Sequence, residues 1–133
     1  MTFRKFDTCT WVDPWFEGLV PNEKLAFVYF WTNEHCNQAG IYTISSERIK
    51  FELGYSIDTV YEAIKCKVEW FPDKSTVWVK NFFKHQCQNS KFAIAALNSI
   101  SKDKFKLQLF INYNKQILEG YNLDLFGYHI DTV

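Results

Sequence analysis

The side chains of this chain that are suited to chemistry are mainly lysines, and they are concentrated in one part of the sequence. Between residues 63 and 109, nine lysines stand against three acidic residues, although the formal net charge of the whole chain is zero. Residues 1–62 have the opposite balance, with five Lys or Arg against nine Asp or Glu. Ammonium groups bind phosphates and release counterions from a nucleic acid. We therefore expect any nucleic-acid surface in the second half of the chain.

The predicted DNA contacts are one hydroxyl and six ammonium groups. They lie on three predicted segments: a candidate recognition helix that begins after Ser56, a hairpin turn that contains Lys74, and the end of the hairpin with the segment after it. Asp58 and Glu62 on the same helix repel phosphate, and the helix has no Arg, Asn or Gln for bidentate base readout. Two interpretations stay open: the helix reads few bases, or the surface binds a protein. The predicted DNA-binding residues are Thr59, Lys65, Lys67, Lys74, Lys80, Lys84 and Lys91.

Other groups of reactive residues have simpler explanations. Two unmatched His/Cys pairs, at residues 35–36 and 85–87, lack the paired close spacing of a four-ligand zinc site. Asp13 and Glu17 fit a helix cap and a solvated helix face rather than a hydrolytic carboxylate pair. The sequence has no Walker A, nucleophile-elbow or HExxH motif. We therefore expect no enzyme, no metal site and no cofactor.

Composition indicates one folded domain. The chain has 133 residues, of which 47% are hydrophobic and 19% aromatic, which is ample for a core. The five tryptophans are expected mainly in that core rather than as base-stacking platforms, with Trp70 as the exception to test. The four cysteines include no CxxC pair and are expected to be free, buried thiols. No apolar run is long enough to span a membrane and no secretory signal is recognisable, so a cytoplasmic location is expected.

Caps and apolar spacing predict the elements that must position these residues. Asp13-Pro14 opens a short helical turn, and Pro21 starts a helix that ends near Asn33, with Leu25 among its inward residues. Residues 41–44 form a short strand, and a helix from Ser45 or Ser46 runs to Gly54. A third helix, capped by Ser56, carries an inward stripe whose members recur at helical spacing: Ile57, Val60, Tyr61, Ile64 and Val68.

A β-hairpin follows the third helix. Its strands are residues 68–71 and 76–80, and Pro72-Asp73-Lys74-Ser75 has the composition of a turn. Two more helices are expected, one capped by Asn89-Ser90 that reaches Ile100 and one over residues 102–118. This order predicts an α+β fold with a winged helix-turn-helix: a three-helix core, a small antiparallel sheet with a wing, and additional C-terminal helices. The expected domain covers residues 1–118, and residues 119–133 form an irregular tail.

Two blocks of sequence are more distinctive than the order of elements. Residues 11–19, 22–25, 30–33 and 39–42 form the first block, and residues 77–86 with Ser90-Lys91 form the second. Together, over about residues 9–100, they resemble the N-terminal winged-helix domain of phage and prophage replisome organisers of the DnaD-like kind. The resemblance implies a domain that binds origin-like double-stranded DNA or self-associates in replication initiation, whereas a separate C-terminal domain engages helicase-loading proteins. The alternative is a module that docks replication partners or oligomerises without binding DNA.

Overall fold

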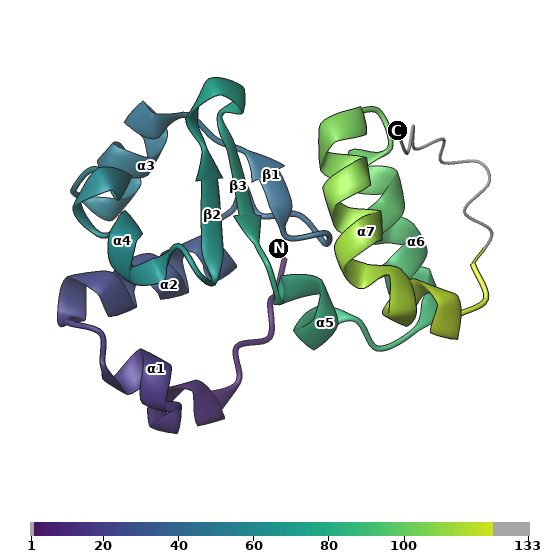
Figure 1. The fold of residues 1–133 in the computed structure, drawn as a ribbon, viewed down its shortest axis with the longest axis horizontal. Coiled ribbons are helices and arrows are strands. Elements are labelled where there is room, and N and C mark those ends of the chain that lie inside the picture. Colours follow the sequence, from purple (N-terminus) through teal and green to yellow (C-terminus); the bar gives the residue numbers. More distant parts are fainter. Residues whose placement is uncertain (1, 124–133) are drawn as a thin grey trace.

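Helices cover both faces of a small antiparallel sheet in the computed structural model, which describes residues 2–123 (Figure 1). From the N-terminus the elements are the 3-10 helix η1 (Thr8–Val12), α1 (Pro14–Glu17), α2 (Pro21–Thr32), β1 (Ile41–Thr43), α3 (Ser46–Leu53), η2 (Ile57–Thr59), α4 (Tyr61–Ile64), β2 (Val68–Phe71), η3 (Pro72–Lys74), β3 (Thr76–Val79), α5 (Phe82–Gln86), α6 (Ser90–Ile100) and α7 (Lys104–Gly120). The fold is α+β, as the sequence predicts, with seven α-helices and one three-stranded sheet among the described residues.

Local caps fix most helix boundaries where the sequence predicts them. The Asp13 carboxylate accepts the backbone N–H of Trp15 at 2.9 Å and begins α1. Ser45 caps α3, and Gly54, with a φ of 95°, ends that helix in the left-handed conformation that glycine adopts at little cost. The Asn89 side chain accepts the N–H of Phe92 and begins α6. Each such cap stabilises its helix by about 1 kcal/mol.

The third helix is the main departure from the expected elements. The sequence predicts one helix from Ser56 through Val68, but the segment divides into η2 and the single-turn α4. Val60 separates them with a φ of −118°, and its N–H bonds to the Ile57 carbonyl in the tighter 3-10 pattern. The sequence assigns Val68 both to the helical stripe and to the strand over residues 68–71, and it lies in that strand, β2, where it pairs with Val79. The inward stripe is nevertheless largely correct: Ile57, Val60, Ile64 and Val68 are buried, and Tyr61 is half-buried against the same cluster.

Three expectations about the burial of side chains are wrong, at least in part. Leu25 is 53% exposed, because α2 buries the face that carries Phe27, Phe30 and Trp31 instead. Among the tryptophans, Trp31 and Trp78 are in the core, whereas Trp11 is exposed. The cysteines are free as expected, but of the four only Cys36 is buried; Cys9 and Cys66 are exposed and Cys87 is half-buried.

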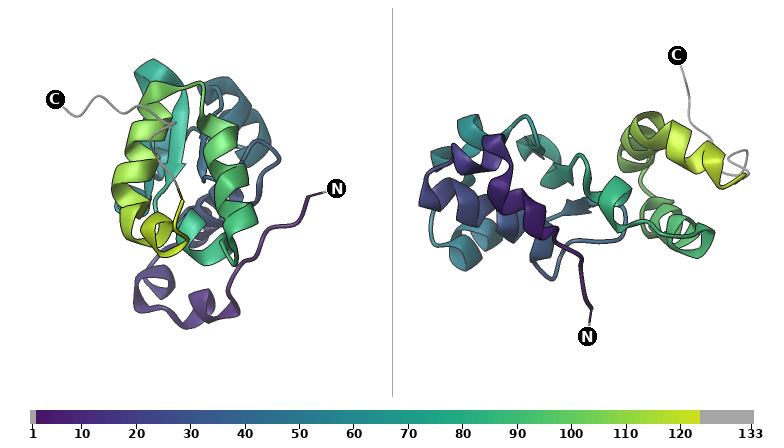
Figure 2. Two further views of the ribbon diagram at one scale, coloured as in Figure 1. Left: turned by 90° about the vertical axis from the view of Figure 1, so that its right-hand side faces the viewer. Right: turned by 90° about the horizontal axis from the view of Figure 1, so that it is seen from below.

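The sheet is the centre of the molecule and separates two hydrophobic clusters. Its strand order is β1-β3-β2, and both pairings are antiparallel. Val77 and Val79 of β3 face the first cluster, which α1 to α4 complete, whereas Trp78 faces the second cluster, formed with α5, α6 and α7. Figure 2 shows α6 and α7 side by side against the sheet. All four residues of β3 are therefore buried.

The tip of the β2–β3 hairpin is held by α7. The ring of Phe71 lies edge-on to that of Phe105, with 5.0 Å between the centroids, and the ammonium of Lys74 lies 4.6 Å from the Phe105 centroid. Nearby, Nζ of Lys106 donates to Oγ1 of Thr43 at 2.5 Å. The hairpin turn, which includes Lys74, thus rests on the first turn of α7.

Within residues 2–123, none of the helices combines the length and apolar character needed to cross a bilayer. The last helix ends at Gly120, two residues beyond the expected boundary at 118. Residues 124–133 of the expected tail lie outside the described residues.

Candidate nucleic-acid interface

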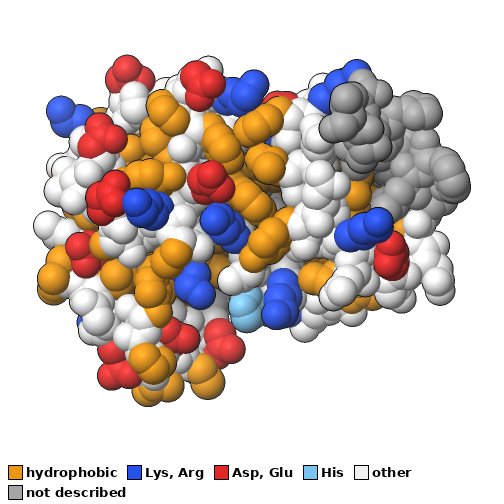
Figure 3. Space-filling model, viewed as in Figure 1, with side chains coloured by type: hydrophobic (Ala, Val, Ile, Leu, Met, Phe, Trp, Pro, Cys, Tyr) orange, Lys and Arg blue, Asp and Glu red, His pale blue; other side chains and the backbone are white. Residues whose placement is uncertain are grey.

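Four lysines lie close to Asn81, either along the chain or in the pockets that Asn81 lines, and we call them the basic band: Lys67, Lys80, Lys84 and Lys115. Lys80 is anchored next to Lys67, because its backbone N–H donates to the Lys67 carbonyl at 3.1 Å. Lys84 and Lys115 line one polar pocket, to which Asn81 also contributes. Figure 3 shows that Lys and Arg side chains are spread across the middle of the face that it draws, from the first helices to the helical hairpin α6–α7. The band joins the end of the sheet to α5 and α7.

Three of the seven predicted DNA-binding residues belong to the basic band, namely Lys67, Lys80 and Lys84. The exposed Thr59 and Lys65 lie on η2 and directly after α4. Lys74 lies at the hairpin tip, where its ammonium contacts Phe105. Lys91 is exposed in the first turn of α6, on the helical hairpin. The predicted set is therefore distributed over several elements instead of following one helix and a projecting wing.

Acidic side chains lie close to two of the predicted lysines, Lys65 and Lys80, and partly neutralise their charge. Glu62 accepts from the ammonium of Lys65 at 2.7 Å, and this hydrogen bond raises the pKa of Lys65. Glu69 lies 3.8 Å from the Lys80 ammonium. The Lys65–Glu62 pair is largely open to solvent, where an ion pair stabilises by less than about 1 kcal/mol, whereas the side chains of Lys80 and Glu69 are 27% and 35% exposed. Lys84 and Lys115 are both exposed and are the members of the band most accessible to a polyanion.

Amide and hydroxyl groups line the polar pocket between α5 and α7. The Tyr113 hydroxyl donates to Oδ1 of Asn81 at 2.9 Å, and its ring lies edge-on to that of Trp78, 5.1 Å between centroids. Asn114 interrupts α7 with a φ of −105°, and its amide nitrogen donates to the Phe110 carbonyl. The pocket thus places amides and a phenol between the ammonium groups of the band, a combination that binds sugar and phosphate oxygens.

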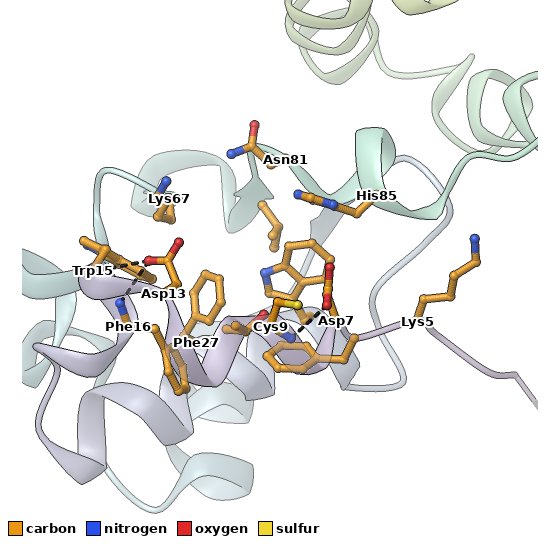
Figure 4. Close-up of a pocket in the computed structure, with 14 residues that line it drawn as sticks. Lys5, Asp7, Cys9, Asp13, Trp15, Phe16, Phe27, Lys67, Asn81 and His85 are labelled. Carbon is orange, nitrogen blue, oxygen red and sulfur yellow. Dashed lines mark hydrogen bonds between the residues drawn. The ribbon is translucent and has the colours of Figure 1, made fainter.

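Asn81 also lines a second cavity. It encloses about 500 Å³ between the N-terminal segment, α2 and the start of α5. Figure 4 shows Lys67, Asn81 and His85 at one side of the cavity, with Trp15, Phe16 and Phe27 across from them. Its position next to Lys67 connects it to the basic band.

The side chain of Gln86 holds the N-terminal segment in place and so closes one side of this cavity. Its Oε1 accepts the backbone N–H of Lys5 at 2.9 Å, and its Nε2 donates to the Lys5 carbonyl at 2.6 Å. Gln86 is 5% exposed, and Arg4 adds a bond from its guanidinium to the Cys36 carbonyl at 2.8 Å. Residues 4–6 are therefore fixed across the molecule by side chains far away in the sequence.

Sequence reasoning missed Asn81, Tyr113 and Lys115 as site residues. Asn81 directly follows Lys80 at the end of β3, and an amide side chain next to a predicted DNA contact could have indicated it from the sequence. Tyr113 and Lys115 belong to α7, and only the packing of α7 against α5 brings them to the band, so nothing local in the sequence indicated them. Among the described residues, no three His, Cys, Asp or Glu side chains come close enough together to hold a metal ion.

Comparison with known proteins gives no assignment: no family model, curated protein or solved structure matches the chain significantly.

Proposed function

We propose that the chain binds DNA through its basic band, as a winged-helix domain of a phage or prophage replication-initiation protein. The order helix, strand, helix, helix, hairpin over residues 21–79 supports the winged-helix assignment, as does a sheet with β3 between β1 and β2. The replication role rests on the sequence blocks that resemble replisome organisers. In this proposal the chain is not an enzyme, and its partners are double-stranded DNA and the proteins of helicase loading.

One observation carries the DNA-binding proposal, on a chain of zero net charge: Lys67 lines a cavity together with Asn81, Lys84 and Lys115 line the next pocket with the same Asn81, and Lys80 directly precedes it. A neutral protein has no general attraction for a polyanion, so affinity has to come from a local cluster. The interrupted helix η2–α4 carries Asp58 and Glu62 on its outer side, which disfavours deep insertion of this segment into the major groove. Phosphate contacts by the band therefore contribute most of the affinity in this proposal.

The test is a titration of a labelled 20-base-pair duplex by fluorescence anisotropy at several salt concentrations. Each phosphate contact contributes about 0.9 to the slope of log K against log salt. The double variant K84A/K115A is therefore expected to bind more weakly and to lower the magnitude of that slope by about 1.8. The control K50A/K102A removes the same charge from exposed positions outside the band and is expected to keep the slope. Equal slopes for the two variants, or no binding at low salt, would contradict the proposal.

The contribution of the hairpin tip is measured separately. Lys74 contacts the Phe105 ring, so its ammonium is already engaged although it is exposed. Lys74→Ala leaves the slope unchanged if DNA lies only on the band, and lowers it by about 0.9 if the tip also binds phosphate. The same titration therefore defines how far the DNA surface extends toward the wing.

A second function, self-association, is favoured by apolar side chains exposed at the N-terminal end. Trp11, Val12 and Leu25 are 59%, 70% and 53% exposed, and the Lys24 ammonium, next to Leu25, lies 6.0 Å from the Trp11 ring. Exposed apolar surface of this kind marks contact sites between proteins. Sedimentation velocity at increasing concentration tests it: a dimer that Trp11→Ser dissociates is the expected result, and a monomer at all concentrations would exclude self-association.

A further inference from the structure

The cavity beside the basic band has the size and the aromatic lining of a ligand site. Its volume of about 500 Å³ lies within the range of about 300–1,000 Å³ that is typical of small-molecule sites. The rings of Phe6, Trp15, Phe27 and Trp31 line it and contact one another at centroid distances of 5.0 to 6.3 Å. Such rings offer surface to a flat, aromatic guest.

One polar atom of this lining has no partner in the described part of the chain. Trp31 is 7% exposed, and its indole Nε1 is fully buried without a hydrogen bond. A buried indole N–H normally finds an acceptor, because an unpaired donor loses its hydration without compensation. Because no water-sized group reaches this nitrogen, an acceptor on a guest would satisfy the donor after the neighbouring rings shift.

The rim of the cavity carries polar groups of both kinds. Because Oδ1 of Asn81 accepts the Tyr113 hydroxyl, its amide nitrogen is the group that it can present to a guest. His85 stands next to it, with its ring centroid 5.7 Å from that of Trp31, and Asp7 supplies acceptors from the N-terminal segment. A guest that combines a flat ring with donors and acceptors on its edge matches this arrangement.

Part of the basic band lies at the same rim. Lys67 lines the cavity, and its ammonium lies 5.6 Å from the Trp15 ring. Lys84 precedes His85 in α5, whereas the ammonium of Lys80 lies 5.5 Å from the Trp78 ring, on the other side of β3 from Val79, which lines the cavity. A phosphate held by Lys67 would therefore lie next to a ring inside the cavity.

We propose that this cavity binds a single nucleobase whose phosphate rests on the basic band. The base stacks on the aromatic lining, and an acceptor on its edge takes the indole N–H of Trp31. Two sources share this chemistry, an unpaired nucleotide of a DNA strand and a free nucleotide. The inference deepens the proposed function and rests on it for the DNA source, because the phosphates of a bound strand would lead its unpaired base to the cavity.

The experiment compares three labelled duplexes that differ at one position: fully paired, with one bulged thymidine, and with an abasic residue in the bulge. Stacking of one base on aromatic side chains corresponds to about 5- to 150-fold in affinity. The thymidine bulge is expected to bind tighter than the other two duplexes by a factor in this range. Replacing the bulged base by 2-aminopurine gives an independent readout on the unaltered protein, because stacking in the cavity quenches its fluorescence.

Trp31→Phe keeps an aromatic ring but removes the unpaired N–H. It is expected to weaken the thymidine bulge by about 2- to 13-fold, the effect of one hydrogen bond, and to leave the paired duplex unchanged. Trp70→Phe is the matched control, because Trp70 lies on β2, does not line the cavity and belongs to neither the basic band nor the exposed apolar side chains at the N-terminal end, so it should change neither affinity.

The outcomes separate this inference from the proposed function. If all three duplexes bind equally and 2-aminopurine is not quenched, the base site is overturned while DNA binding by the band stands. If a deoxynucleoside monophosphate binds with dependence on Trp31 and no duplex binds, the base site stands with a free nucleotide as its source and the DNA function fails. If neither binds, both are overturned.

Discussion

Gly40 offers a sharp test of how tightly the sheet is packed against α5. Its φ is 72°, and a Cβ added there would lie 2.5 Å from Cβ of Phe82, far inside contact distance. Phe82 cannot give way easily, since it is fully buried and its ring lies 5.2 Å from that of Trp31. The left-handed backbone costs an L-residue about 1–2 kcal/mol, and overpacking of a core costs about 1–3 kcal/mol. Gly40→Ala should therefore lower the free energy of unfolding by about 2–5 kcal/mol.

Gly54 provides the matched control for this prediction. Its φ of 95° is also left-handed, but an added Cβ would meet nothing within 4 Å. Gly54→Ala should therefore cost only the backbone term of about 1–2 kcal/mol, and Gly54→Asn less, because asparagine tolerates this conformation. Urea denaturation followed by circular dichroism measures both midpoints. If Gly40→Ala is no more destabilising than Gly54→Ala, the close approach of Phe82 is incorrect.

Three further predictions follow from individual contacts. Phe105→Ala removes the ring against Phe71 and Lys74 and should cost about 1–2 kcal/mol and speed amide exchange at residues 72–75; unchanged exchange would refute the docking of the hairpin tip on α7. Burial raises the pKa of the Cys36 thiol from 9.0 to about 12, so the folded state keeps a proton that the unfolded state loses, and stability should fall above about pH 9 by up to about 1.4 kcal/mol per pH unit. Cys36→Ala should fall less steeply between pH 8 and 11, and equal slopes in urea denaturation would count against it. Asp13→Ala should cost about 1 kcal/mol in thermal unfolding and Asp13→Asn much less, whereas equal losses would deny the cap.

Signals within a few residues predicted most element boundaries. Asp13, Ser45 and Asn89 each cap the helix that the sequence assigned to them, because a side-chain acceptor and the N–H it satisfies are only two or three residues apart. Gly54 ended its helix for an equally local reason. Where one stretch fitted two structures, tertiary pairing decided: Val68 satisfied the helical stripe but joined β2.

The candidate site was less predictable, since it depends on contacts between distant segments. The excess of lysines in the second half was visible, and three of the predicted residues lie in the band. Lys115 joins them only because α7 returns to α5, and Lys74 rests on α7 for the same reason. The cavity is even harder to predict from the sequence, because it depends on the hydrogen bonds between Lys5 and Gln86, which are 81 residues apart. Hydrophobic periodicity and composition give no information about contacts between such distant segments.

Strand β3 is apolar on both faces, so each face has to be covered by other elements. The helical hairpin α6–α7 covers one of these faces and is therefore part of the core of the domain. Ile41 and Trp78 turn toward α5, α6 and α7, so a chain cut after residue 88 would bare them to water. The truncated protein should therefore aggregate, and its β2–β3 hairpin tip should lose the contact with Phe105 of α7. The helical hairpin α6–α7 and the first 80 residues should accordingly melt together, in one transition, and neither should serve as a minimal domain.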